Sequence, residues 1–141
     1  MPTIFYRRGN DIPLAKFIEL LRSNVLGERR PLDNQAAMAD ILHHANLIIS
    51  AWNGDQLVGI ARSLTDFSFV AYLADLAVHQ AFQRHGIGKE LIRQTRIALG
   101  PESKIVLIAT PSAVGYYPHL GFTHHPEAWV LHASDPLPGN H

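Results

Sequence analysis

Residues 69–99 read FVAYLADLAVHQAFQRHGIGKELIRQTRIAL, which has the pattern of a central strand followed by a helix. Residues 69–78 are mostly apolar, which is typical of a strand in the centre of a sheet. Residues 86–99 have apolar side chains at helical spacing and end before a Gly-Pro pair, so they predict a helix. Residues 105–109 follow as a short, fully apolar strand. A strand, a helix and a strand in this order require two parallel strands joined by a right-handed crossover.

The chain before this unit predicts one strand and two helices. Residues 3–7 have the composition of a short strand, and residues 11–26 carry an apolar stripe at helical spacing. A second helical segment within 33–45 places Met38, Ile41, Leu42 and Ala45 on one face. The charged run Glu28-Arg29-Arg30 between the two helices reads as a solvated connection.

A hairpin is expected between these helices and the long strand. Residues 47–52 and 57–62 are β-type runs, and the Asn-Gly-Asp-Gln sequence at 53–56 is a strong turn signal. The two runs should therefore pair antiparallel.

The last part of the chain predicts a short helix and closing strands. Residues 112–120 can form the helix, and residues 122–124 and 128–132 have the composition of strands. We expect one domain over residues 1–134, followed by a frayed tail at 135–141 that contains two prolines and a glycine.

Composition predicts one compact globular domain without nucleic-acid or membrane partners. The chain has 141 residues, of which 47% are hydrophobic, which suffices for one core. Lys and Arg together number 12, as do Asp and Glu, so the basic excess typical of nucleic-acid and lipid binding is missing. No segment resembles a signal peptide or a membrane span, so we expect a location in the cytoplasm.

Residue types that the chain lacks exclude several chemistries. There is no cysteine, which rules out disulfides, thiolate metal sites and an acyl-cysteine intermediate. The nine histidines include two adjacent pairs, but neighbouring residues point apart and no HExxH spacing occurs. We therefore expect no metal.

The turn at residues 83–89, Gln-Arg-His-Gly-Ile-Gly-Lys, has the properties of a phosphate-binding site. It lies between a strand and a helix, where free N–H groups and the helix dipole attract an anion, and its glycines allow close approach. A dinucleotide fingerprint would need a third glycine where Leu91 stands, and a nucleotide-triphosphate loop would need Ser or Thr where Glu90 stands. A tight turn without a ligand is the alternative.

Two motifs resemble the GNAT acetyltransferase superfamily. Leu-Ala-Val at 76–78, followed by Gln83-x-x-Gly86-x-Gly88, is similar to the family's coenzyme A signature. The segment YYPHLGF at 116–122 is similar to the family's aromatic segment after the fifth strand. The resemblance covers about residues 73–122 and implies the acyl-CoA N-acyltransferase fold. That fold is a mixed, centrally splayed sheet of six to seven strands with about four helices, and the family often forms homodimers through late strands.

The resemblance also implies a site for acetyl-CoA, whose pantetheine arm would lie between the splayed strands and whose pyrophosphate would rest on the turn. The backbone of Ala77 or Val78 would face the acetyl carbonyl and stabilise its oxyanion in the transition state. The cofactor-binding residues expected in this way are Leu76, Ala77, Val78, Gln83, Arg84, His85, Gly86, Ile87, Gly88, Lys89, Ser112 and Tyr117.

The reaction involves two proton transfers, which call for a general acid and a general base. Tyr117 matches the family's general acid, which would protonate the leaving thiolate, and its alternative role is a packed aromatic. Asp75 and His79 alternate onto one face of the long strand, so either can serve as general base, directly or through water. The alternatives are a structural partner for Asp75 and a strand-end residue for His79.

The resemblance therefore implies an acetyl-CoA-dependent N-acetyltransferase (EC 2.3.1 type) in which a primary amine attacks the thioester directly. The alternative is an acyl-CoA-binding regulatory or interaction module with the same fold and little turnover. The acceptor stays open among arylalkylamines, polyamines, aminoglycosides, lysine side chains and peptide N-termini, with a small molecule favoured over a protein.

Overall fold

The computed structural model describes residues 3–139. The chain divides into two compact units, Met1–Thr110 and Pro111–His141, which are described separately below. The first unit holds the sheet and three of the α-helices, and the second unit holds the fourth.

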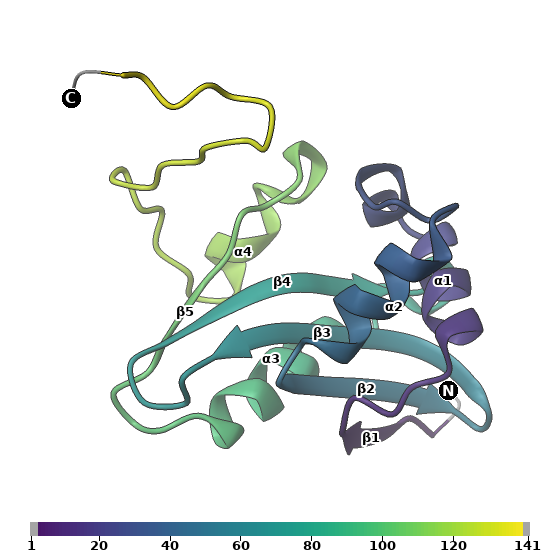
Figure 1. Ribbon diagram of the computed structural model, residues 1–141. Coiled ribbons are helices and arrows are strands. Elements are labelled where there is room, and N and C mark those ends of the chain that lie inside the picture. Colours follow the sequence, from purple (N-terminus) through teal and green to yellow (C-terminus); the bar gives the residue numbers. More distant parts are fainter. Residues whose placement is uncertain (1–2, 140–141) are drawn as a thin grey trace. The chain divides into compact units, whose positions relative to one another are not determined.

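The first unit is built on a sheet whose strands follow one another in chain order (Figure 1). The strands are β1 (Phe5–Arg8), β2 (Leu47–Asn53), β3 (Gln56–Thr65), β4 (Val70–Val78) and β5 (Lys104–Val106). Neighbouring strands from β1 to β4 are antiparallel, and β4 and β5 are parallel. The hairpin and the parallel unit expected from the sequence are both present.

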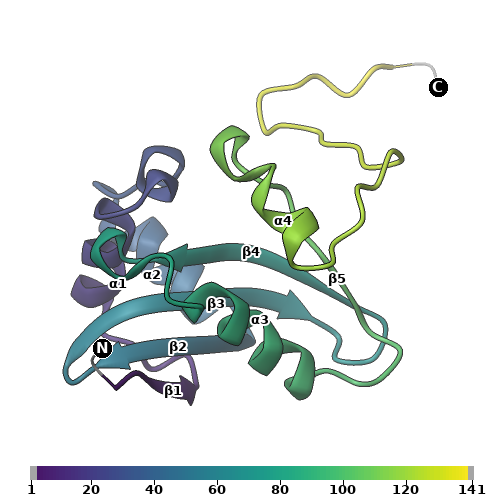
Figure 2. The ribbon, with the colours of Figure 1, turned by 180° about the vertical axis from the view of Figure 1, so that it is seen from behind.

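Three α-helices cover the two faces of this sheet. They are α1 (Leu14–Arg22), α2 (Gln35–His43) and α3 (Ile87–Ala98), and two short 3₁₀ helices, η1 (Val25–Arg29) and η2 (Gln80–Phe82), follow α1 and β4. Helices α1 and α2 lie on one face and α3 on the other, as Figures 1 and 2 show from opposite sides. Helix α1 is shorter than the predicted range 11–26, because Pro13 stands at its N-cap and Asn24 is extended.

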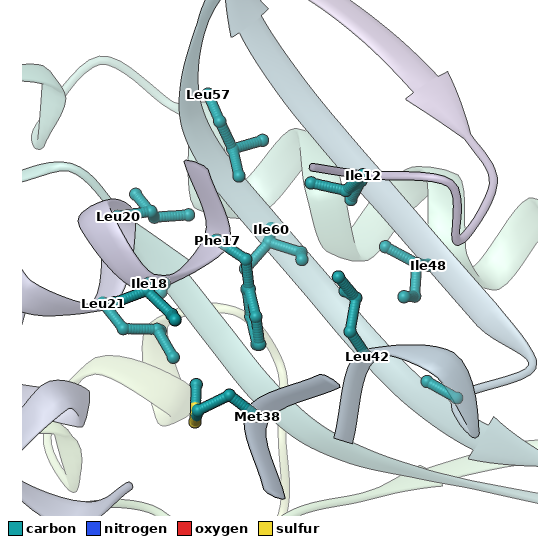
Figure 3. Close-up of a cluster of buried hydrophobic side chains, with 12 residues drawn as sticks. Ile12, Phe17, Ile18, Leu20, Leu21, Met38, Leu42, Ile48, Leu57 and Ile60 are labelled. Carbon is teal, nitrogen blue, oxygen red and sulfur yellow. The ribbon is translucent and has the colours of Figure 1, made fainter. Parts of the chain in front are cut away.

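The main core lies between the sheet and the α1 and α2 side (Figure 3). Phe17, Leu21 and Met38 are fully buried there, next to Ile60 of β3. On the opposite face the backbone of Gly59 lies close to α3, since a Cβ at that position would be 3.1 Å from side-chain atoms of both Ile87 and Leu91. Both layers therefore pack closely against β3.

A β-bulge at Ala74 changes the direction of the side chains along β4. Arg62 of β3 is paired with Asp75, while the next residue, Ser63, is paired with Leu73. Ala74 has no partner in this register, so one residue is inserted on β4. Leu73 and Asp75 therefore face opposite sides of the sheet, although they are two residues apart.

Strands β4 and β5 separate after three paired residues. Residues 70–72 pair with residues 104–106, and β4 then continues to Val78 without a strand beside its outer edge. This confirms the centrally splayed sheet. The expected strand at 105–109 is shorter and begins one residue earlier, at Lys104.

The second unit differs from the expectation. It contains the 3₁₀ helix η3 (Pro111–Ala113) and α4 (Tyr116–His119), which together with the first unit makes four α-helices. The strands predicted at 122–124 and 128–132 are wrong: within residues 3–139 the sheet has five strands, not six or seven. β-type composition forms a strand only where a neighbouring strand takes up the backbone hydrogen bonds, and Trp129 here is 91% exposed.

Replacing Phe17 with Ala tests the core. We expect the free energy of unfolding to fall by about 3–5 kcal/mol, because a fully buried ring is lost and a cavity remains. Urea denaturation measures this change. Phe5→Ala is the control, since Phe5 is 64% exposed on the edge strand and should cost less than about 0.5 kcal/mol. Equal losses in the two variants would contradict this account of the core.

Candidate active site at the splayed edge of β4

The outer edge of β4 carries backbone groups that no strand satisfies. The N–H of His79 donates to the Val58 carbonyl of β3 over 2.7 Å, which sets the alternation of the ladder. Ala77 and Asp75 accordingly turn their backbone groups toward β3, and Leu76 and Val78 turn theirs toward the gap. Of the predicted trio at 76–78, Leu76 and Val78 therefore present hydrogen-bonding groups at the splayed side, and Ala77 does not.

Side chains occupy two carbonyls of this edge. The Val78 carbonyl accepts from Asn24 Nδ2 over 2.9 Å and from Gln83 Nε2 over 3.1 Å, and the Ala74 carbonyl accepts from Arg30 Nη2 over 2.8 Å. Among residues 3–139, no partner is found for the N–H and C=O of Leu76 or for the N–H of Val78. Leu76 and Val78 are half-buried, so these three groups are open to water or to a ligand.

The turn after η2 has the backbone conformation that an anion site needs. Arg84 and Gly86 have positive φ angles of 69° and 81°, and α3 begins at Ile87 without a side-chain cap. The first helical hydrogen bond runs from the Glu90 N–H to the Gly86 carbonyl over 3.1 Å. Among residues 3–139, no protein acceptor is found for the N–H groups of residues 86–89. A Cβ at Gly86 would meet nothing within 4 Å, so glycine is needed there for its φ angle.

The side chains of this turn divide into three kinds. Ile87 is buried in the core, and Gln83 holds the end of β4 through the bond just described. Arg84 and Lys89 are exposed, so their charges can reach an anion. The carboxylate of Glu90, which would repel an anion, is paired with Arg93 over 2.6 Å. The hydrogen bonds from Arg93 and Gln94 lower the pKa of Glu90 to about 2, so this balanced pair persists at neutral pH.

Asp75 lies inside the sheet rather than at its surface. Its side chain is fully buried, and its two oxygens bond Arg30 and Arg62, each over 2.5 Å. Arg62 reaches further to the Ile41 carbonyl of α2 over 3.3 Å. A carboxylate held by two guanidinium groups is poorly placed to take a proton from a substrate, so the geometry favours the structural alternative for Asp75.

His79, the second candidate base, also has a local partner. Its Nδ1 accepts from the Ala81 N–H over 3.1 Å, which caps η2, and its ring meets Phe82 edge-on. This arrangement fits the strand-end role weighed for His79 in the sequence.

Two predicted site residues, Ser112 and Tyr117, belong to the second unit. Tyr117 is half-buried between Tyr116 and Phe122, with both ring centroids at 5.4 Å. The Phe122 N–H donates to the Tyr117 carbonyl over 3.1 Å, which closes a turn around Gly121. Burial, together with the neighbouring Tyr116, raises the pKa of Tyr117 to about 12.

Three residues of this region were missed or misread in the sequence. The reading of Arg30 as part of a solvated run is wrong, because its side chain is only 19% exposed and bonds β4. Asn24 and Arg62 gave no signal, because each acts through a contact distant along the chain. The charged Asp75 in an apolar strand was the available clue, since a buried carboxylate needs cationic partners.

Comparisons with known proteins agree with this architecture. The model of the family described as Acetyltransferase (GNAT) domain matches residues 29–130. The chain belongs to the GNAT acetyltransferase family.

Named relatives support the same assignment. "Uncharacterized N-acetyltransferase ycf52" from Gracilaria tenuistipitata var. liui is 34% identical, over 78% of this chain and 62% of that protein. "Histone acetyltransferase TAP1" from Glycine max is 31% identical, over 88% of this chain and 58% of that protein. The chain thus spans about three fifths of the length of these two proteins.

A solved structure shows the same fold. Aminoglycoside N-acetyltransferase AAC(6')-Iy in complex with CoA aligns with a TM-score of 0.72 over 95% of this chain and 97% of its own. At a sequence identity of 17%, this similarity shows a shared fold and nothing further. No helix among residues 3–139 is long and apolar enough to cross a membrane.

Asp75→Asn tests the structural role of the buried carboxylate. We expect the free energy of unfolding to fall by about 3–5 kcal/mol, because two guanidinium groups lose their anion in the interior. Thermal or urea unfolding measures the loss. Asp33→Asn is the matched control, since Asp33 is 99% exposed beside Arg22 and should cost less than about 1 kcal/mol. Unchanged stability in Asp75→Asn would instead favour a general base at this position.

Proposed function

We propose that this chain is an acetyl-CoA-dependent N-acetyltransferase that moves an acetyl group to a primary amine. The observation that carries the proposal is two sets of backbone groups without a protein partner. One set lies at Leu76 and Val78 on the edge of β4, and the other consists of N–H groups in the turn before α3 and its first residues. One extended ligand with a hydrogen-bonding arm and an anionic end would satisfy both parts.

The anionic end would be the pyrophosphate of coenzyme A. The N–H groups of residues 84–89 lie at the positive end of the α3 dipole, and Gly86 and Gly88 put no side chain in the way. His85 would contribute through its backbone, and Arg84 and Lys89 would add positive charge. The arm would lie along β4 and pair with Leu76 and Val78, as a strand would.

When bound, acetyl-CoA supplies an acetyl group activated as a thioester. The free backbone N–H nearest the thioester, at the end of the arm away from the pyrophosphate, would donate a hydrogen bond to the carbonyl oxygen as negative charge develops there. The chain has no cysteine, so the amine would attack the thioester directly, without a covalent acyl-enzyme.

Tyr117 is the proposed general acid for the leaving thiolate. Its phenol is protonated at physiological pH, as an ordinary tyrosine is, so it can donate to the sulfur. Its pKa, raised to about 12, makes it a weaker acid than an exposed tyrosine. The proposal assigns no general base to Asp75, whose oxygens are already taken by Arg30 and Arg62. Ser112 is retained as a proposed contact of the cofactor.

The acceptor is proposed as a class, a primary amine, with a small molecule favoured. The relatives named above include a histone acetyltransferase, and a structural neighbour is an aminoglycoside acetyltransferase. An amine panel must therefore include tyramine, spermidine, kanamycin and a lysine-containing peptide. A cytoplasmic location and a homodimeric state remain predictions.

Titration calorimetry with coenzyme A tests the proposal. We expect binding at the turn, and at least about tenfold weaker binding of pantetheine, which lacks the charged end and its hydrogen bonds. Lys89→Gln should weaken the binding of coenzyme A. Lys104→Gln, which removes a charge from β5, should leave this affinity unchanged. No binding would overturn the proposal. If the chain binds coenzyme A but releases no thiol with any amine of the panel, the acyl-CoA-binding module is favoured.

Tyr117→Phe tests the general acid. We expect kcat to fall by about 100-fold or more, with little change in the affinity for coenzyme A, because only the proton donor is lost. Tyr116→Phe is the matched control and should keep kcat. Since the raised pKa keeps the proton on Tyr117 until the pH is well above 10, the wild-type rate should show no alkaline loss from this group below pH 10. An unchanged kcat in Tyr117→Phe would remove Tyr117 from the mechanism.

A further inference from the structure

The connection between α1 and α2, residues 23–34, touches the outer edge of β4 at two points. Asn24 Nδ2 donates to the Val78 carbonyl, and Arg30 Nη2 donates to the Ala74 carbonyl. Leu76 lies midway between these carbonyls, and its N–H and C=O stay open. The connection thus closes the edge on both sides of one residue.

Asn24 is held in place from its own side of the contact. Its backbone is extended, with φ −135° and ψ 155°, and its Oδ1 accepts from the Leu26 N–H over 3.0 Å, which caps η1. The same amide donates to Val78. Both ends of one planar group are therefore used, so its position against β4 is well defined.

Arg30 is anchored more strongly. Its guanidinium bonds Asp75 through Nε and Nη2, the Ala74 carbonyl through Nη2, and the Arg29 carbonyl through Nη1. Asp75 is in turn held by Arg62 of β3. Arg30 thereby satisfies a carbonyl of the β4 edge that has no strand partner, and it links the connection to the interior of the sheet.

We infer that Asn24 and Arg30, the clasp residues, set the register in which the acyl thioester lies along β4. This inference rests on the proposed function. A ligand that pairs with the edge like a strand could slide by two residues and form the same kind of hydrogen bonds. The clasp residues oppose this, because Arg30 occupies the Ala74 carbonyl, Asn24 shares the Val78 carbonyl with Gln83, and Leu76 is left as the central pairing site.

The register matters because reaction demands close approach. A slip of two residues along a strand moves the ligand by about 6.6 Å. The attacking and acyl atoms must come within about 3–3.5 Å, and small misplacements lower the rate steeply. The clasp residues are therefore positioning residues, and their loss should affect turnover more than the grip on the pyrophosphate.

Two variants open the clasp, and two matched variants control for them. Asn24→Asp keeps an oxygen for the Leu26 N–H but puts an oxygen in place of the donor to Val78. Asn34→Asp is its control, because Asn34 caps α2 by accepting from the Ala37 N–H over 3.0 Å. Arg30→Lys keeps the charge but loses the planar fork that serves both Asp75 and Ala74. Arg29→Lys is its neighbour control.

Three measurements separate positioning from general damage. Calorimetry gives the Kd for coenzyme A, amide hydrogen exchange gives the protection of the Leu76 and Val78 N–H groups by acetyl-CoA, and the thiol-release assay gives kcat with the best amine of the panel. In both clasp variants we expect a Kd within about twofold of wild type, because the pyrophosphate contacts are elsewhere. Protection at Leu76 should be lost, and kcat should fall about 10- to 100-fold.

The outcomes distinguish this inference from the function on which it rests. If the wild-type chain does not bind coenzyme A, both are overturned. If it binds and acetyl-CoA protects Leu76 equally in the clasp variants and their controls, only the register role is overturned. The same holds if Kd weakens in parallel with kcat, since that indicates a general distortion. Should Arg30→Lys fail to fold, Asn24→Asp decides, because it removes no buried charge.

Discussion

A backbone N–H or C=O that loses its strand partner must find another, and this constraint organises the first unit. Strand β4 has β5 beside it for three residues and then continues alone to Val78. Two of the carbonyls exposed in this way are taken by Asn24, Arg30 and Gln83. The groups left over at Leu76 and Val78 form a short edge that a ligand can occupy. The candidate site thus consists of backbone groups that the sheet itself leaves unpaired.

The buried charged residues Asp75, Arg30 and Arg62 also stabilise the outer edge of β4. Asp75 faces the α1 and α2 side because the bulge at Ala74 reverses the alternation of β4, and Arg62 stands opposite it in the register. Removing two guanidinium groups and a carboxylate from water is costly, and only good geometry with additional hydrogen bonds offsets that cost. The cluster meets this demand by bonding Ala74 and Ile41 as well. Its effect is to tie α2, β3 and the α1–α2 connection to one point of β4.

Membership of the family is better supported than the chemical reaction. GNAT membership follows from the matched residues 29–130, whereas the proposed activity names groups that belong to two separately described units. The backbone site lies in the first unit, and Tyr117 lies in the second. Burial and the neighbouring Tyr116 raise the pKa of Tyr117 to about 12, so its phenol is protonated at physiological pH, as an ordinary tyrosine also is. The raised pKa makes it a weaker proton donor than an exposed tyrosine.

Local patterns in the sequence were sufficient for several features. The hairpin turn at 53–56, the parallel unit around α3 and the turn at 83–89 each depend on neighbouring residues, so glycines and apolar spacing predicted them. The predicted splayed sheet was likewise correct, through the resemblance carried by two motifs. Strand composition alone was misleading at 122–124 and 128–132, because a strand also needs a partner edge.

The tertiary structure alone decided which groups meet. A bulge of one residue at Ala74 cannot be read from a run of apolar letters, yet it determines that Asp75 points at Arg62 rather than toward α3. Arg30 looked like a solvated charge because its partners are 44 and 45 residues away along the chain. Local sequence determines backbone conformation through short-range sterics and hydrogen bonds. Contacts between distant residues depend on register and packing, which exist only once the chain has folded.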